Sequence, residues 1–273
     1  MRGEFVDIGG QRLYYYAAGT RGSGLAVVLL HGFPLSSRLW HLVVRDFPPE
    51  HRLVVCDLPG YGRSDLPHAG AANCAAHAAA VLALLDDLRI ESAAFVGHGL
   101  GGGVAQALAV MAPERVSHLA LVSSAAFGQP PRRLARLPRR MGALALRTPP
   151  SLLAGLVHGS ARLGFANADR SRLTLDGCLQ AFTTPAGREA LVAHLHALDH
   201  CDTAEWSPRL GELDVPSAVI WGREDPYLPV ALGERLATEL RHAEFTVIDG
   251  ARHYVPEDSP EQLVRALEPL LRR

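Results

Sequence analysis

Short apolar segments alternate with longer amphipathic or alanine-rich segments along much of the chain. The runs at residues 25–30 and 52–56 are continuously apolar, as is typical of strands buried on both faces of a sheet. Further strands are predicted at residues 5–8, 12–18, 93–96, 116–122, 218–221 and 244–248. Helices are predicted between or after the strands, at residues 37–47, 71–88, 100–111, 230–240 and 260–271.

Strands that alternate with helices predict an α/β fold with a mainly parallel sheet covered by helices on both faces. The alternation is lost between residues 125 and 210, where several prolines and a cluster of arginines occur. We interpret this stretch as a helical cap inserted after the sixth strand. The predicted organisation is a core formed by residues 1–124 and 211–273 and a cap formed by residues 125–210.

Residues 93–103 (AAFVGHGLGGG) join an apolar strand to an Ala/Val/Leu-rich helix through a glycine turn. This is the arrangement of a nucleophile elbow, G-x-S-x-G, in which a serine is held at the tip of a sharp strand-to-helix turn. Here the corresponding residues 97–101 are GHGLG, so the tip is Gly99 and carries no side chain. A tip residue with a Cβ is strained by roughly 1–3 kcal/mol. Glycine avoids this strain because it adopts positive φ freely.

Candidate catalytic residues follow the carboxyl ends of other predicted strands, which is where ligands bind in parallel sheets. The strand ending at Trp221 leads to Asp225, and the strand ending at Ile248 leads to His253. The strand ending at Leu30 leads into the sequence HGFP. The order along the chain is elbow, Asp and then His, which is the order of nucleophile, acid and base in α/β hydrolases.

Four motifs together carry a family resemblance: residues 31–34 (HGFP), 57–64 (DLPGYGRS), 97–102 (GHGLGG), and 221–225 (WGRED) followed by 250–253 (GARH). On these motifs the sequence resembles the α/β-hydrolase superfamily, in the branch whose helical cap lies between the sixth and seventh strands. That branch includes epoxide hydrolases, haloalkane dehalogenases, carbon–carbon-bond hydrolases and esterases. The resemblance covers nearly the whole chain outside the cap. It implies an α/β-hydrolase fold with an eight-stranded, mainly parallel sheet.

The resemblance also implies roles for particular residues. His253 matches the catalytic base, and Asp225 matches the acid that fixes the imidazole tautomer and stabilises the imidazolium. The backbone N–H groups of Phe33 and Leu100 match the two donors of an oxyanion hole. Gly99 stands where the family carries Ser, Asp or Cys, and this is the one departure from the pattern.

Several other residues are weaker candidates. His31 in the HGFP motif and His98 in the elbow are expected to brace the loops. His98 is also a candidate substrate contact. The full set of candidate substrate contacts is His98, Trp40, Phe127 and Tyr254. Ser123 and Ser124 follow the sixth strand at a carboxyl edge, and they are the only serines considered as substitute nucleophiles.

The glycine at the tip leaves three hypotheses open. In the first, Gly99 is native and the protein is an enzyme without a covalent step. His253, oriented by Asp225, would then be a general base for a water or for an acidic site on a small, largely hydrophobic substrate, which allows hydrolysis, elimination, retro-aldol cleavage or cyclisation. In the second, Gly99 is an engineered substitution in an ordinary Ser or Asp hydrolase. In the third, the protein is a non-catalytic ligand-binding module.

Composition and charge narrow the range of partners and chemistries. The net charge is -1, so no overall field favours nucleic acid or an anionic membrane, and a small-molecule substrate is expected. All 27 basic residues are arginine, which excludes Schiff-base chemistry and Ser–Lys dyads. No cofactor is predicted, because the elbow explains the glycines that a dinucleotide fingerprint would also require.

Metal binding and membrane insertion are not predicted either. The group His194, His196 and His200 has ligand-like spacing, but we do not infer a metal site from it. The N-terminal residues lack an apolar signal segment, and no apolar run is long enough to cross a bilayer. A cytoplasmic protein, either a monomer or a homodimer, is therefore expected. The four cysteines show no CxxC spacing and are expected to be reduced.

Overall fold

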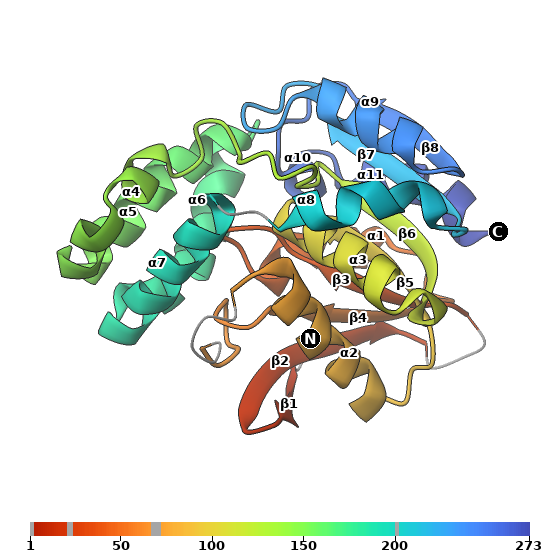
Figure 1. The fold of residues 1–273 in the computed structure, drawn as a ribbon, viewed down its shortest axis with the longest axis horizontal. Coiled ribbons are helices and arrows are strands. Elements are labelled where there is room, and N and C mark those ends of the chain that lie inside the picture. The colour runs from red at the N-terminus through yellow and green to blue at the C-terminus, as the bar shows by residue number, and fades with distance from the viewer. Residues whose placement is uncertain (1–2, 21–23, 67–71, 200–201) are drawn as a thin grey trace.

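An eight-stranded sheet runs through the centre of the molecule (Figure 1). The computed structural model describes residues 3–20, 24–66, 72–199 and 202–273, and its strand order is β1-β2-β4-β3-β5-β6-β7-β8. The strands are β1 (Glu4–Ile8), β2 (Gln11–Gly19), β3 (Ala26–Leu30), β4 (Arg52–Cys56), β5 (Ala93–His98), β6 (Val116–Val122), β7 (Ser217–Gly222) and β8 (Ala243–Ile248). Strand β2 pairs antiparallel with β1 and β4, and all other neighbours pair parallel. The predicted strands and the mainly parallel sheet are confirmed.

The helices of the core follow the predicted alternation closely. They are α1 (His41–Asp46), α2 (Cys74–Asp87), α3 (Leu100–Met111), α9 (Val230–Glu239), α10 (Val255–Asp258) and α11 (Pro260–Leu271). The helix predicted at residues 37–47 is divided into a 3-10 turn, η1 (Ser37–Trp40), and α1, with Ser36 capping the first turn through the N–H of Arg38. The helix predicted from residue 71 begins at Cys74, and residue 71 itself lies outside the described residues. A further 3-10 turn, η2 (Pro113–Arg115), leads into β6.

The insertion between β6 and β7 is helical, as expected from the lost alternation. Its elements are α4 (Arg136–Arg140), η3 (Gly142–Arg147), α5 (Pro150–Ala161), η4 (Arg162–Gly164), α6 (Ala168–Leu179), η5 (Gln180–Thr183), α7 (Pro185–Asp199), α8 (Thr203–Trp206) and η6 (Ser207–Glu212). Helices α4 to α7 form a lobe to one side of the sheet (Figure 1), whereas α8 packs against α3. The division of the chain at residues 124 and 210 remains a prediction.

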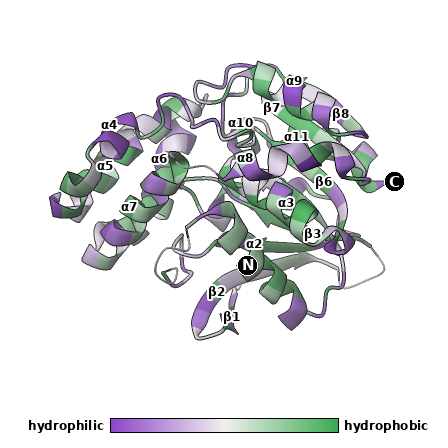
Figure 2. Cartoon of the chain, in the orientation of Figure 1, coloured by the Kyte–Doolittle hydropathy of each residue, from purple (hydrophilic) through white to green (hydrophobic). Residues whose placement is uncertain are grey.

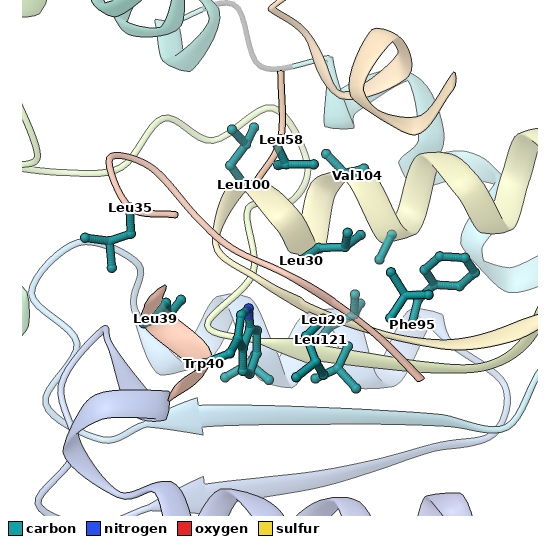
Figure 3. Close-up of a cluster of buried hydrophobic side chains, with 14 of the residues drawn as sticks. Leu29, Leu30, Leu35, Leu39, Trp40, Leu58, Phe95, Leu100, Val104 and Leu121 are labelled. Atoms are coloured by element: carbon teal, nitrogen blue, oxygen red, sulfur yellow. The ribbon is translucent and has the colours of Figure 1, made fainter. Parts of the chain in front are cut away.

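The hydrophobic core is built on the central strands, and Figure 2 shows hydrophobic residues on these strands and on the helices beside them. Val27, Val28 and Leu29 in β3 are completely buried, in line with the predicted double-sided burial. Trp40 is also completely buried, and it lies with Leu39 near Leu29 in this core (Figure 3). Its ring packs η1 onto the sheet, and the expected substrate contact by Trp40 stays a prediction.

None of the helices formed by the described residues combines the length and the apolar character needed to cross a membrane. Three of the four cysteines, Cys56, Cys74 and Cys178, are buried, and the fourth lies outside the described residues. Their burial is consistent with the expected role of small core residues.

Replacement of Gly101 by alanine should destabilise the protein severely. An ideal Cβ on Gly101 would lie 2.3 Å from the carbonyl oxygen of Leu30 and 2.6 Å from that of His31, both of them backbone atoms at the end of β3. Forcing a methyl group into this space costs about 3 kcal/mol or more. Urea unfolding of Gly101→Ala measures the loss.

The matched control is Gly155→Ala, at an exposed position in α5 where an ideal Cβ meets nothing within 4 Å. Alanine is a better helix former than glycine, so this variant should be stabilised by roughly 0.5–1 kcal/mol. Equal stability of the two variants would contradict the close approach of α3 to β3.

Candidate active site

The turn between β5 and α3 has the geometry expected of a nucleophile elbow. Gly99 has φ +54° and ψ -116°, a conformation that a residue with a Cβ adopts only under strain. Its N–H donates to the carbonyl of Val122 over 3.1 Å, and its own carbonyl accepts the N–H of Ala125 over 2.9 Å. These hydrogen bonds to β6 and the residues after it fix the tip above the carboxyl end of the sheet.

His253 and Asp225 form a buried hydrogen-bonded pair beside this turn. His253 Nδ1 lies 2.8 Å from Asp225 Oδ2, and the two side chains are only 4% and 0% exposed. The second carboxylate oxygen accepts the N–H groups of Tyr227 and Leu228 over 2.8 and 3.0 Å. Asp225 therefore both fixes its loop and orients the imidazole. Because a carboxylate only accepts, Nδ1 carries the proton and Nε2 has a free lone pair.

The free nitrogen of His253 faces the tip of the elbow. An ideal Cβ on Gly99 would lie 3.4 Å from His253 Nε2 and 3.5 Å from the Cα of Gly32. Both distances are ordinary van der Waals contacts, so a Cβ at position 99 meets no clash between the histidine and the HGFP loop, although the backbone conformation would strain it. The structure thus brings together Gly99, His253 and Asp225, which come from three separate loops.

Two backbone N–H groups border the same point. Leu100 is the first residue of α3, so its N–H lies at the positive end of the helix dipole. Phe33 follows β3 in the HGFP loop, and its ring is buried. Within the described chain neither N–H donates a hydrogen bond to another protein group. Their expected role as oxyanion donors stays a prediction.

Two further histidines hold the loops of the site in place. The ring of His98 donates from Nε2 to the carbonyl of His253 over 2.9 Å and lies 4.7 Å from the His253 ring, between centroids. His31 accepts the N–H of Leu58 at Nε2 over 3.0 Å. Burial lowers the pKa of both imidazoles, so both are neutral. This geometry supports the expected bracing role and gives no support to a substrate contact by His98.

Tyr254 and Phe127, the other two predicted substrate contacts, lie in different environments. Tyr254 packs against the site, with its ring centroid 5.0 Å from that of His253 and 4.2 Å from that of Phe165. Phe127 is only half-buried, and the guanidinium of Arg235 in α9 lies 3.8 Å from its ring centroid. Tyr254 stays a candidate contact, whereas the environment of Phe127 is explained by its packing against α9.

The serines considered as substitute nucleophiles are engaged elsewhere. Ser123 is completely buried, and its hydroxyl faces the N–H of Gly222 at 3.5 Å. The Ser124 hydroxyl donates to the carbonyl of Ala125 and accepts from Gln106 Nε2, over 2.9 and 3.0 Å. Their hydrogen bonds join β6 to its neighbours and give no indication of nucleophilic function.

The insertion is hydrogen-bonded to the loop that carries His253, a connection that the sequence motifs did not predict. Asp258 accepts the N–H of Arg252, next to His253, and the N–H of Ala166 in the insertion, each over 2.9 Å. The N–H of Tyr254 donates to the carbonyl of Gly164 over 3.1 Å. An ideal Cβ on Gly164 would lie 2.5 Å from the Tyr227 ring, so only glycine permits this approach. An acidic pair just after the histidine, Glu257-Asp258, was the available signal.

Glu257 makes a second connection to the insertion, and its carboxyl group is buried and has a raised pKa. Its side chain is 1% exposed and accepts the hydroxyl of Thr174 in α6 over 2.8 Å. His41 Nδ1 lies 3.5 Å from the same carboxylate oxygen, Oε1. Burial raises the pKa of Glu257 to about 7, while Thr174 and the nearby Arg170 act in the opposite direction.

No metal ligand set accompanies these residues: the described parts of the chain contain no group of three or more His, Cys, Asp or Glu side chains that could hold an ion. His194 and His196 lie on α7, and His200 lies outside the described residues.

A surface cavity of about 620 Å³ opens between core and insertion, and neither Gly99 nor His253 lines it. Its lining includes Tyr14, Tyr16, Asp57, Arg38 and Arg63.

Comparisons with known proteins agree with this fold and these motifs. The family profile described as alpha/beta hydrolase fold matches residues 26–260. The chain is 29% identical over 274 residues to a 2-hydroxy-6-oxononadienedioate/2-hydroxy-6-oxononatrienedioate hydrolase of Burkholderia vietnamiensis, covering 96% of this chain and 91% of that protein. It is 26% identical over 273 residues to epoxide hydrolase 4 of Mus musculus, covering 92% and 74%. The structure of a thermophilic esterase from Thermogutta terrifontis matches with a TM-score of 0.80 and 26% identity, covering 100% of this chain and 98% of that one.

Glu257→Gln should remove a pH-dependent loss of stability. Because the pKa of Glu257 is raised from 4.5 to about 7 on folding, its stabilising contribution is present in full below about pH 4.5 and is lost as the pH rises through 7. The shift corresponds to at most about 3 kcal/mol. Urea unfolding at several pH values should show the wild type losing stability relative to Glu257→Gln by that order between about pH 5 and pH 8.

Glu261→Gln is the matched control, since this side chain in α11 is 70% exposed. Its stability should follow that of the wild type at every pH. If Glu257→Gln also follows the wild type, the buried carboxylate is not the group that titrates.

Proposed function

The chain belongs to the alpha/beta hydrolase fold family, and we propose that it is a hydrolase-family enzyme that acts on a small, largely hydrophobic molecule without a covalent serine intermediate. The observation that supports this proposal is the 3.4 Å distance between His253 Nε2 and the Cβ position of Gly99. The proposed base is aimed at the point where relatives with a complete elbow would hold a nucleophile, and Gly99 supplies no atom that could bond to substrate.

His253 is the proposed general base. With Nδ1–H donated to Asp225, the lone pair on Nε2 can accept a proton from a water. The water oxygen then forms a bond to the substrate carbonyl carbon, and the carbonyl π electrons move to its oxygen. When the tetrahedral intermediate collapses, the leaving group departs with the proton that the imidazolium returns. General base catalysis of this kind contributes roughly 10²–10⁴ to the rate.

The N–H groups of Phe33 and Leu100 are the proposed oxyanion donors. In hydrolysis they would hold the carbonyl oxygen as negative charge develops on it, and loss of one such donor costs roughly 10²–10³ in turnover in a comparable enzyme. The same donors would hold an enolate if His253 removed a proton from the substrate itself. The proposed chemistry therefore includes elimination and cyclisation as well as hydrolysis.

An ordinary Ser or Asp hydrolase with a changed residue at position 99 is the second candidate. The ordinary contact distances around the Cβ position, 3.4 and 3.5 Å, support it, because a nucleophilic side chain would fit there. A purely ligand-binding role is less well supported. It would give no reason to keep His253 and Asp225 as a buried, hydrogen-bonded pair beside the elbow.

Gly99→Ser should create a nucleophile in reach of His253. We expect hydrolysis of p-nitrophenyl acetate to rise at least about a hundredfold, since removal of the serine from a comparable triad costs roughly 10⁶. Covalent labelling by a fluorophosphonate should appear only in this variant. Gly99→Ala, which adds the Cβ without the hydroxyl, is the matched control and should gain neither property. A folded Gly99→Ser variant that is neither active nor labelled would contradict the proposed site.

His253→Ala tests the mechanism of the unchanged chain. Wild-type turnover of p-nitrophenyl acetate should fall about a hundredfold or more on removal of the general base. Asp225→Asn should reduce the rate as well, because it disturbs the tautomer of His253. His118→Ala, at a histidine on β6 whose ring nitrogen Nδ1 lies 3.0 Å from the hydroxyl of Ser117, serves as the control. Equal rates for the wild type and His253→Ala would refute a catalytic role for the pair.

A further inference from the structure

Three buried polar rings from distant parts of the chain lie together between the core and the insertion. Tyr61 follows β4, His77 lies in α2 and His194 lies in α7, and each side chain is at most 1% exposed. The rings of Tyr61 and His194 are stacked with centroids 3.9 Å apart. The His77 ring lies 6.1 Å from Tyr61 and 6.0 Å from His194. Phe182 packs beside the cluster, with its ring centroid 6.0 Å from that of Tyr61.

Most polar atoms of these rings have no hydrogen-bond partner in the described chain. The unpartnered atoms are the hydroxyl of Tyr61, both ring nitrogens of His77, and Nδ1 of His194. The carbonyl of Ala72 faces His77 without reaching hydrogen-bond geometry. Each buried polar group left unpaired lowers the free energy of unfolding by about 1–3 kcal/mol, so three such side chains in contact destabilise the fold. A group that binds among them and satisfies them accounts for their retention.

The cluster borders the proposed oxyanion site. The Tyr61 ring lies edge-on to His31 at 5.0 Å and to Phe33 at 6.5 Å, between centroids. The cluster therefore lies against the side chains of the HGFP loop, which also carries the N–H of Phe33. The mechanism proposed above uses none of these three polar side chains.

We propose that Tyr61, His77 and His194 form a second polar subsite, which binds a neutral, hydroxyl-bearing part of the substrate. The subsite deepens the proposed function, and it rests on that function only for the position of the reacting oxygen. Its hydrogen-bonding groups include both donors and acceptors, which is the combination that a hydroxyl group requires.

The protonation of each ring follows from its burial and contacts. Burial raises the pKa of the Tyr61 phenol well above its usual range, so the hydroxyl keeps its proton and donates. Burial lowers the pKa of His194 to about 3, and its Nε2 donates to the carbonyl of Gly60 over 3.4 Å, which leaves Nδ1 as an acceptor. Burial also lowers the pKa of His77, so that ring has one donor and one acceptor.

A charged ligand group fits this cluster poorly. All three rings are uncharged, so a carboxylate would lose its hydration without gaining an opposite charge. It would also face the lone pairs of two imidazole nitrogens. An alcohol, phenol or enol donates one hydrogen bond and accepts others, and so satisfies both kinds of atom.

The test is a binding titration that requires no turnover. Benzyl alcohol, benzoate and toluene serve as hydroxyl, carboxylate and apolar probes of similar size, and the imidazole resonances of His77 and His194 report on binding by NMR. We expect benzyl alcohol to shift these resonances and to bind at least about tenfold more tightly than the other two probes. Tyr61→Phe should weaken the binding of benzyl alcohol about five- to tenfold and leave toluene unchanged.

Stability separates a binding role from a structural one. Because the Tyr61 hydroxyl has no hydrogen-bond partner among the described residues, Tyr61→Phe should unfold at the same temperature as the wild type or at a higher one. Tyr15→Phe is the matched control: it removes a hydroxyl that donates to Glu4 over 2.9 Å, and it should leave probe binding unchanged.

The subsite would be refuted if benzoate bound more tightly than benzyl alcohol, or if Tyr61→Phe were destabilised but bound benzyl alcohol normally. It would also be refuted if no probe moved the His77 and His194 resonances, which would mean that the cluster holds only water. The titration is repeated with His253→Ala, where binding should persist. Full esterase activity of His253→Ala together with normal binding would refute the proposed function and leave the subsite standing.

Discussion

The close approach of α3 to the ends of β3 and β5 is the constraint on which the site depends. Gly97 and Gly101 leave no space for a Cβ, since one would meet the backbone of Gly101 or Leu30 at 2.3 Å. This contact forces the sharp turn at Gly99, with φ +54°. It also leaves the N–H of Leu100 at the helix terminus beside the HGFP loop. The positions of the tip and of the proposed oxyanion donors are therefore consequences of packing between backbones.

Hydrogen bonds between the insertion and the loop after β8 extend this constraint to the proposed base. Asp258 joins the residue before His253 to Ala166, and Tyr254 joins the residue after it to Gly164. From the other side, Asp225 holds the imidazole at Nδ1. The imidazole is consequently fixed from both the core and the insertion. A base held in this way loses little freedom when it reacts, which is the advantage of a preorganised site.

The buried polar groups of this protein fall into two kinds. Asp225 and Asp258 accept hydrogen bonds at both of their carboxylate oxygens, and each of them fixes a loop. Tyr61 and His77 have polar atoms that no described residue pairs. Because an unpaired buried group destabilises the fold whereas a paired one specifies it, the two kinds are expected to serve different purposes. This contrast separates the groups that build the site from those proposed to recognise what enters it.

The sequence by itself determined the strand–helix alternation, the helical insertion, the glycine at the tip of the elbow and the order of Asp225 and His253. These features are local: hydrophobic periodicity, glycine turns and short motifs are all visible within a few residues. Only the tertiary structure placed Trp40 in the core and Phe127 beneath Arg235, because the burial of an aromatic ring depends on which distant segment packs against it. The cluster of Tyr61, His77 and His194 was likewise invisible in the sequence, since its members come from three elements that meet only when the insertion folds over the core.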